Sequence, residues 1–184
     1  MPDWQVATLI RSTPIATNVR SLIFAVDSWR EHISGQHYSI RLTAPDGYQA
    51  QRDYSVASPP ERAGVLEFGI ELFPDGEVSP YLHQMAVGEK VELLGPIGGH
   101  FNWDISMPGP LVLIGGGSGV VPLMSMIRHH LHHLGAEDSR DVYLLVSART
   151  EGHILYWDEL QAARGRDPNF NPTVTLTREA PADW

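Results

Sequence analysis

The sequence predicts a β plus α/β fold, in which a six-stranded antiparallel Greek-key barrel precedes a partial doubly wound parallel sheet. In the N-terminal part, short β-rich runs are separated by turn sequences such as Pro45-Asp46-Gly47 and Pro74-Asp75-Gly76, which is typical of small barrels. After Met107-Pro108-Gly109-Pro110, apolar runs alternate with helical patterns, as in a doubly wound sheet. We therefore expect two domains, residues 1–106 and residues 107–184, the second of them incomplete.

The predicted barrel strands combine β-branched and aromatic residues with closing prolines, glycines and aspartates. They are residues 5–11, 19–26, 36–43, 52–57, 65–73 and 90–94. A short helix is expected over residues 78–86, where Ser79 can cap the first turn and Pro80 suits the first helical position.

Apolar runs and helical patterns alternate after the proline-glycine segment. The strands are expected over residues 111–114, 142–146 and 173–177, and the helices over residues 122–134 and 154–163. The first run is wholly apolar, which is typical of a parallel strand buried on both faces. Three such strands form only one side of a doubly wound sheet. We therefore expect the first strand to keep an unpaired apolar edge and the chain to be part of a longer one.

Composition and charge exclude several classes of function. The 184 residues include no cysteine, which excludes disulfides, thiolate metal sites, cysteine-ligated iron–sulfur clusters and cysteine nucleophiles within them. The net charge of −9 gives no overall attraction to nucleic acid or anionic lipid. No apolar run approaches the length of a membrane span, and the start Met1-Pro2-Asp3-Trp4 lacks the pattern of a secretory signal. We expect a cytoplasmic protein without a nucleic-acid or membrane partner.

The sharpest local feature is the sequence Arg52-Asp53-Tyr54-Ser55. Side chains two apart on a strand share a face, so Arg52 and Tyr54 should point the same way. A guanidinium offers a bidentate donor to phosphate, and a phenol ring offers a plane for stacking. This pair suits a ligand with a flat ring and a phosphate, which Ser55 would reach only if the strand twists or ends there. The alternative is an ordinary tyrosine–arginine pair on a barrel surface.

Two glycine-containing segments follow in the same half. Gly76-Glu77-Val78-Ser79 enters the short helix, where free backbone N–H groups favour phosphate. Gly95-Pro96-Ile97-Gly98-Gly99-His100-Phe101 would let backbone approach a ligand closely. Taken singly, the first segment is better explained as an ordinary turn with an N-cap than as a phosphate site. For the second segment, the alternative is a linker between domains.

In this order and spacing, Arg52-x-Tyr54-Ser55, Gly76-x-Val78-Ser79 and Gly95-Pro96-x-Gly98-x-x-Phe101 resemble the ferredoxin–NADP⁺ reductase superfamily. The resemblance covers essentially the whole chain. It implies an FAD-dependent NAD(P)H oxidoreductase, with FMN as the less favoured flavin. Glu71 departs from the family pattern, and we expect its carboxylate to face away from the flavin diphosphate.

The resemblance also implies the roles of individual residues. Arg52 would bind the flavin diphosphate. Tyr54 would stack on the isoalloxazine ring and Ser55 would lie near its reactive nitrogen, which makes these two the candidate catalytic residues. Val78 and Ser79 would contact the FAD phosphates, and Gly76 beside them is a further candidate cofactor-binding residue.

A second glycine-rich segment, Gly115-Gly116-Gly117-Ser118-Gly119-Val120-Val121-Pro122, directly follows an apolar strand and precedes a helix. Glycines in this context allow a tight turn and close approach of a pyrophosphate, whose charge a helix N-terminus favours. The segment resembles the Gly-Gly-x-Gly-x-x-Pro loop of the same family. The predicted nucleotide contacts are Gly115, Gly116, Gly117, Ser118, Gly119 and Pro122. The alternative is a tight turn without a ligand.

Residues at the carboxyl ends of the next two strands bear on the choice of nucleotide. Ser147 and Arg149 follow the second strand, and Arg178 follows the third. No acidic residue directly ends the second strand to engage a ribose diol, and the two arginines can pair with a 2′-phosphate. We therefore expect NADP(H) rather than NAD(H), although Glu151 lies close in sequence and solvated arginines remain the alternative.

The run His129-His130-Leu131-His132-His133 places imidazoles three or four residues apart, a spacing that can bind metal. It also lies at the end of a predicted helix, where a partly protonated histidine favours the helix dipole. Because no acidic or cysteine partner is evident in the sequence, we expect no metal site. The spread tryptophans Trp29, Trp103 and Trp157 are expected to pack rather than to stack on nucleic acid.

The expected reaction is hydride transfer from NAD(P)H to FAD, followed by electron transfer to an acceptor. The acceptor is open: ferredoxin, flavodoxin, an oxygenase component or a small molecule. The alternatives are a dehydrogenase that uses nicotinamide alone and a non-catalytic flavin-binding electron-transfer or regulatory subunit. We expect residues 1–184 by themselves to bind flavin but to transfer hydride poorly.

Overall fold

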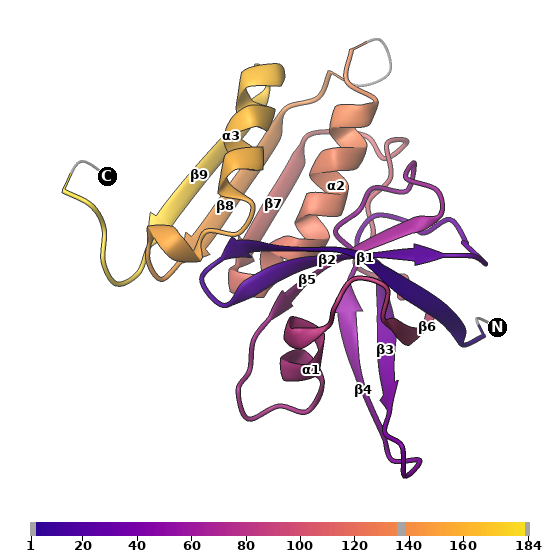
Figure 1. The fold of residues 1–184 in the computed structure, drawn as a ribbon. Coiled ribbons are helices and arrows are strands. Elements are labelled where there is room, and N and C mark those ends of the chain that lie inside the picture. The colour runs from indigo at the N-terminus through magenta and orange to yellow at the C-terminus, as the bar shows by residue number, and fades with distance from the viewer. Residues whose placement is uncertain (1–2, 136–138, 183–184) are drawn as a thin grey trace.

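The computed structural model describes residues 3–135 and 139–182. Residues 1–2 of the first expected domain, and residues 136–138 and 183–184 of the second, therefore lie outside the described residues. The described residues form a six-stranded sheet with the order β4-β3-β6-β1-β2-β5 and a three-stranded sheet with the order β7-β8-β9. Figure 1 shows the three-stranded sheet and its helices beside the sheet formed by the N-terminal strands. The predicted fold class, an antiparallel barrel followed by a partial parallel sheet, is confirmed.

The strands of the first sheet pair antiparallel with each neighbour. They are β1 (Gln5–Ala16), β2 (Val19–Val26), β3 (His37–Thr43), β4 (Gln49–Ser55), β5 (Val65–Glu71) and β6 (Lys90–Ile97). The edge strands β4 and β5 are joined by a bridge between Val56 and Phe68, which curls the sheet into a barrel. Fully buried side chains such as Phe24, Phe68 and Tyr38 fill its interior.

Two barrel strands are longer than the sequence predicts. β1 continues through Pro14 to Ala16, because from Arg11 onward it pairs with β2 alone and the missing N–H of Pro14 meets no second neighbour. β6 likewise continues through Gly95 and Pro96 to Ile97. The prolines therefore mark positions that lack a ladder hydrogen bond rather than strand ends.

Helix α1 (Val78–Gln84) follows β5 and buries Leu82 against the barrel core. The prediction that Ser79 caps this helix is wrong. Its hydroxyl accepts a hydrogen bond from the Phe73 N–H at 3.0 Å, and Glu77 stands at the N-cap without a side-chain bond. The turn that ends at Gly76 brings the Phe73 backbone beside the first turn of the helix, so the Ser79 hydroxyl is bonded to Phe73 and does not cap the helix.

The second sheet consists of the parallel strands β7 (Leu111–Gly116), β8 (Val142–Ala148) and β9 (Phe170–Leu176). Helices α2 (Val121–His132) and α3 (Trp157–Arg166) lie together on one side of it, as Figure 1 shows. Short 3-10 turns, η1 (Gly117–Val120) and η2 (Glu151–His153), precede these helices. As expected, β7 stands at the sheet edge in the described residues.

The expectation that the first apolar run is buried on both faces is wrong. Leu111 and Leu113 of β7 pack beneath the helices, whereas the alternate side chains point to the opposite face. That face carries no helix within the part of the chain that the structure describes. Its exposed fractions lie between 39% and 69% for Val112, Ile114, Tyr143 and Leu145.

The two halves share one hydrophobic cluster. Val19, Ala57 and Trp103 of the first half pack with side chains of the parallel sheet and α2. Gly69 on β5 approaches α2 so closely that a Cβ there would lie 2.6 Å from Val121 Cγ2. The Ser125 hydroxyl donates to the Ser58 carbonyl at 2.8 Å. These contacts hold the start of α2, with the glycine-rich segment before it, against the barrel.

Candidate flavin and nucleotide sites

Arg52 and Tyr54 lie on the same face of the edge strand β4. The register places Tyr54 opposite Tyr38 and Arg52 opposite Ile40, and directly opposed residues of an antiparallel pair share a face. Tyr54 is half-buried against the barrel core. Burial raises the pKa of its phenol to about 12, although the nearby Arg52 charge opposes the shift. The phenol therefore stays protonated across the physiological range.

Arg52 is an exposed cation beside one carboxylate. Its side chain is 60% exposed, one guanidinium nitrogen donates to the Gln51 carbonyl at 2.7 Å, and the other lies 3.9 Å from Glu77. The Glu77 carboxylate also accepts a hydrogen bond from the Tyr48 hydroxyl at 2.8 Å. A surface pair at this distance contributes little, so the guanidinium remains available to an anion.

Ser55 is the last residue of β4 and is half-buried opposite His37. The strand ends there, which is the condition under which its hydroxyl can turn toward a ligand held by Tyr54. The backbone then passes to Val56, whose bridge to Phe68 closes the barrel.

Polar groups of the segment Gly76 to Ser79 are already hydrogen-bonded within the turn that follows β5. The Gly76 N–H donates to the Phe73 carbonyl at 2.9 Å, and the Ser79 hydroxyl bonds the Phe73 backbone. Val78 and Ser79 are buried. The Gly76 N–H and the Ser79 hydroxyl therefore shape the turn, and a phosphate could meet only the remaining backbone N–H groups at the start of α1.

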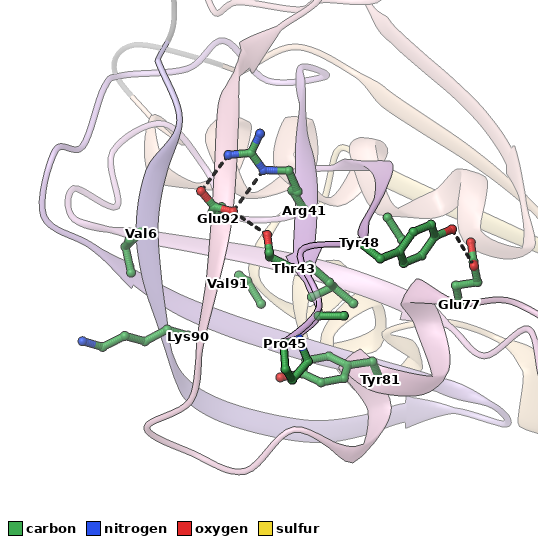
Figure 2. Close-up of a pocket in the computed structure, with 13 residues that line it drawn as sticks. Val6, Arg41, Thr43, Pro45, Tyr48, Glu77, Tyr81, Lys90, Val91 and Glu92 are labelled. Atoms are coloured by element: carbon green, nitrogen blue, oxygen red, sulfur yellow. Dashed lines mark hydrogen bonds and ion pairs between the residues drawn. The ribbon is translucent and has the colours of Figure 1, made fainter.

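A cavity of ≈ 730 Å³ is lined by Glu77 among other residues. Figure 2 shows the polar groups that line it: the Tyr48–Glu77 pair, the Arg41 guanidinium bound to Glu92, which also accepts from Thr43, and the Lys90 ammonium. The walls between them are largely apolar, with Tyr81 among the lining residues. Ala50, which shares the face of Arg52 and Tyr54 on β4, also lines this cavity. Sequence reasoning missed it, because its lining comes from distant segments.

The glycine-rich segment turns from β7 into α2 through η1. A Cβ on Gly115 would lie 2.8 Å from Leu123 Cδ1 and 3.1 Å from the Gly119 carbonyl oxygen, so a larger residue would require both neighbours to shift and glycine is favoured here. Gly117 has a positive φ of +53°, which also favours glycine. Pro122 stands in the first turn of α2, where its missing N–H costs no hydrogen bond.

A second cavity, of ≈ 300 Å³, brings five of the nine predicted nucleotide residues together between the two halves. Its second-half lining includes Gly116, Gly117, Ser118, Ser147 and Arg149. Gly119 and Pro122 follow directly in η1 and α2, outside this lining.

Two further residues bear on the charge of this cavity. The backbone N–H of Arg178 donates to the Arg149 carbonyl at 3.0 Å, which places the backbones of these two exposed residues side by side. Glu71 lines this second cavity, and residues 52–55 are absent from its described lining. A carboxylate there opposes an anionic ligand.

The histidine run also differs from expectation. The sequence shows no acidic partner, but the structure places Glu61, from the segment between β4 and β5, against His129 and His133. His130 is engaged elsewhere, with its Nε2 atom 2.8 Å from buried Asp167. No local pattern could have indicated Glu61, which lies 68 residues before His129. Trp103 packs against the His129 ring, in line with the packing role expected of it.

None of the helices in the described part of the chain combines the length and apolarity that a membrane crossing requires.

Two family models match the chain. The Oxidoreductase FAD-binding domain matches residues 6–103, and the Oxidoreductase NAD-binding domain matches residues 113–184. The first match contains the β4 motif, and the second contains the last four of the six residues of β7 with the glycine-rich segment.

Curated relatives cover almost the whole chain. The chain is 33% identical to ferredoxin–NADP reductase B of Sorangium cellulosum, over 96% of this chain and 71% of that protein. It is 28% identical to NADH-cytochrome b5 reductase 2 of Yarrowia lipolytica, over 92% of the chain and 58% of the relative. It is 31% identical to the reductase component of phenol 2-monooxygenase from Pseudomonas sp., over 92% and 47%. The chain thus spans between 47% and 71% of the length of these relatives.

Solved structures share the fold. The Amycolatopsis cytochrome P450 reductase superposes with a TM-score of 0.85 at 25% identity, covering 100% of this chain and 54% of that one. The FAD/NAD-binding domain of Vibrio cholerae nitric oxide dioxygenase superposes with a TM-score of 0.86 at 20% identity, covering 97% and 76%.

Proposed function

The chain belongs to the ferredoxin–NADP⁺ reductase superfamily, and from this membership we propose that it holds the flavin site and part of the nicotinamide site of an FAD-dependent NAD(P)H oxidoreductase. Bound FAD would supply the redox chemistry, accepting a hydride from the nicotinamide and releasing electrons to an acceptor. The residues of this chain would bind the flavin and the nicotinamide, orient them, and shield them from water. The observation that carries the proposal is the shared face of Arg52 and Tyr54 on the edge strand β4.

The β4 face fits FAD. The Tyr54 ring is held against the barrel core and offers a stacking plane, and its protonated phenol adds no negative charge beside a flavin. Arg52, two residues away, offers a guanidinium to the diphosphate. Ala50, two residues further, borders the cavity of Figure 2, which would receive the adenosine end. FMN lacks that end and would leave the cavity empty, so FAD is the proposed flavin. Ser55 keeps the role that the family resemblance implies. Val78 and Ser79 would meet the FAD phosphates through their backbone N–H groups, whereas the Gly76 N–H is already bonded to the Phe73 carbonyl and would shape the turn.

The second cavity fits a nicotinamide dinucleotide. The tight turn from Gly115 to Gly119 leads into a 12-residue helix, whose N-terminus favours a pyrophosphate. Ser147, Arg149 and Arg178 gather at the carboxyl ends of β8 and β9, where a doubly wound sheet binds its ligand. Two adjacent arginines suit the 2′-phosphate of NADP(H), which is the proposed nucleotide.

A non-catalytic flavin-binding electron-transfer or regulatory subunit is the second candidate. Glu71 favours it, because a carboxylate facing the nucleotide cavity opposes pyrophosphate binding. Flavin that is retained but reduced by neither NADPH nor NADH, in a chain as long as the relatives, would support this candidate.

The acceptor follows from the relatives only as a class. Their names refer to ferredoxin, cytochrome b5 and phenol 2-monooxygenase, so we propose a redox protein or an oxygenase component. The domain ranges 1–106 and 107–184 agree with family matches that end at 103 and begin at 113, and we retain them as a proposal. A cytoplasmic location also stays a prediction, as does the absence of nucleic-acid and membrane partners.

Anaerobic titration of the FAD-reconstituted protein with NADPH and then with NADH tests the proposal. Flavin absorption that bleaches faster with NADPH would support both the reductase and the nucleotide preference. Equal rates would remove the preference alone. Full steady-state turnover by residues 1–184 would contradict the expectation that they transfer hydride poorly.

A further inference from the structure

A cluster of imidazoles and carboxylates lies apart from both cofactor sites. His129 and His133 stand one helical turn apart at the end of α2, and both face the Glu61 carboxylate. His133 Nε2 lies 3.0 Å from Glu61 Oε1, and His129 Nδ1 contacts the same oxygen. One potential ligand atom from each residue lies within 4.8 Å of the other two.

The spacing and the donor set match those of a metal site. Histidines at i and i+4 on a helix with a carboxylate from another segment are a recurrent arrangement for zinc. Zinc–ligand bonds of about 2.0–2.1 Å in a tetrahedron put neighbouring ligand atoms roughly 3.3 Å apart. The 3.0 Å separation of the His133 and Glu61 atoms is close to that value, so small side-chain shifts suffice.

Asp104 supplies a second feature of metal sites. It lies 3.8 Å from His129 Nε2, the ring nitrogen that faces away from Glu61. A histidine that ligates metal through one nitrogen commonly presents the other to a carboxylate, which orients the ring and increases its basicity. Asp104 is therefore placed as the orienting partner of His129.

An independent observation concerns the cavity that holds the cluster. It measures ≈ 530 Å³ and is also lined by His32, which is only 1% exposed and whose Nδ1 atom has no hydrogen-bond partner among the described residues. Glu61 Oε2 is likewise shielded from solvent and unpartnered there. Among the described lining residues there is no lysine or arginine to compete with a cation.

We propose that Glu61, His129 and His133 bind a divalent transition-metal ion, for which Zn²⁺ is the best match, and that the ion ties the segment after β4 to the end of α2. Imidazole and carboxylate donors without thiolate suit this class of ion. Because Glu61 belongs to the barrel half and both histidines to the other half, the ion would brace the contact between them. The site includes no residue of the flavin or nicotinamide sites, so the metal proposal is independent of the proposed function.

Calorimetric titration of the chelator-treated chain with Zn²⁺ near neutral pH tests the site. We expect one ion per chain, with affinity reduced at least about a hundredfold in Glu61→Gln and in His133→Gln. Loss of an orienting carboxylate typically weakens metal binding 10–100-fold, so Asp104→Asn should weaken it by about that factor. His132→Gln is the matched control, because it removes an exposed histidine of the same run and should leave the affinity unchanged.

Two further measurements separate loss of zinc binding from poor folding of a variant. Circular dichroism should show the same secondary structure in each variant, and Zn²⁺ should raise the midpoint of thermal unfolding of the native chain. Anomalous diffraction at the zinc edge should place the ion between Glu61, His129 and His133 of the native chain. Absence of Zn²⁺ binding, equal affinity in all variants, or a zinc peak elsewhere would overturn the proposal.

Discussion

The guanidinium of Arg128 on α2 lies 3.0 Å from the carboxylate of Glu67 on β5, and this ion pair joins the two halves of the molecule. Glu67 is 5% exposed and also accepts from the Ser21 hydroxyl at 2.8 Å. Arg128 additionally binds Glu159 of α3 at 2.6 Å. Burial by itself would lower the pKa of Arg128, but the hydrogen bonds to Glu159 and the charge of Glu67 raise it above its ordinary range.

Replacing Arg128 by methionine should destabilise the fold strongly. The variant leaves the buried Glu67 carboxylate with only the exposed Arg62 as a nearby cation, at 3.8 Å, and removing the closer partner of a buried ion pair typically costs about 3–5 kcal/mol of unfolding free energy. Urea unfolding followed by circular dichroism measures the change. Arg62→Met is the control: Arg62 lies 3.8 Å from the same carboxylate but is 45% exposed, so its loss should cost less than about 1 kcal/mol. Equal losses in the two variants would refute a special role for Arg128.

Arg52→Ala should weaken FAD binding without unfolding the barrel. A charge-assisted hydrogen bond contributes about 1.5–3 kcal/mol, which corresponds to a loss of roughly tenfold to a hundredfold in affinity. Quenching of flavin fluorescence on binding gives the dissociation constant. Arg20→Ala removes an arginine that is bound to Ser12 on the neighbouring strand, and it should leave the constant unchanged. An unaltered constant in Arg52→Ala would remove the proposed diphosphate contact.

The Tyr54 phenol should titrate at high pH. Burial raises its pKa to about 12 from the ordinary value of 10.0. The folded state therefore keeps a proton that the unfolded chain releases. The stabilising contribution of this phenol to the free energy of unfolding is fully present below pH 10 and is lost as the pH rises toward about 12. The difference in phenolate absorbance between the native chain and Tyr54→Phe isolates this group. A difference curve centred near the ordinary value would show that Tyr54 is solvated rather than held against the core.

Arg149→Ala and Arg178→Ala should each weaken binding of NADP⁺ more than that of NAD⁺. Each removes one cation from the proposed 2′-phosphate contact, worth about 1.5–3 kcal/mol or roughly tenfold to a hundredfold in affinity. Calorimetric titration with both nucleotides measures the ratio, and Arg164→Ala on the exposed side of α3 is the control. Equal weakening for both nucleotides would point to a pyrophosphate contact instead.

Glu71→Gln tests whether the carboxylate in the nucleotide cavity opposes nucleotide binding. Removing the negative charge should strengthen binding of either nucleotide by about fivefold, the scale of one partly screened charge interaction of about 1 kcal/mol. The same calorimetric titration reads the effect. Weaker binding in Glu71→Gln would mean that the carboxylate serves the nucleotide, for instance through a ribose hydroxyl, and that it does not oppose the site.

Much of the fold could be predicted because the local signals agree with the tertiary structure. β2 was expected over 19–26 and is observed as Val19–Val26, since its turns and its residue types both define it. The glycine-rich segment could be placed between a strand and a helix from its sequence alone. The strands containing Pro14 and Pro96 could not be bounded in this way, because whether a proline ends a strand depends on which neighbour lacks a partner there.

The parts that sequence could not predict depend on contacts between distant segments. Nothing local indicates that Glu61 meets His129 and His133, or that Glu71 faces the nucleotide cavity. The buried-strand pattern of β7 was misread for a related reason: a wholly apolar run does not reveal which faces the described helices cover. The roles of Arg52, Tyr54 and Ser55 remain predictions that only ligand binding can test.

The most direct measurement of the central claim is the visible absorption spectrum of the purified chain after incubation with FAD and removal of free flavin. The account predicts an equimolar amount of retained FAD with its absorption bands shifted from those of the free flavin, and reduced retention in Arg52→Ala and Tyr54→Ala. Bands that NADPH bleaches would add the nucleotide half of the claim. No retained flavin, with either FAD or FMN, in a chain that circular dichroism shows to be folded would contradict it.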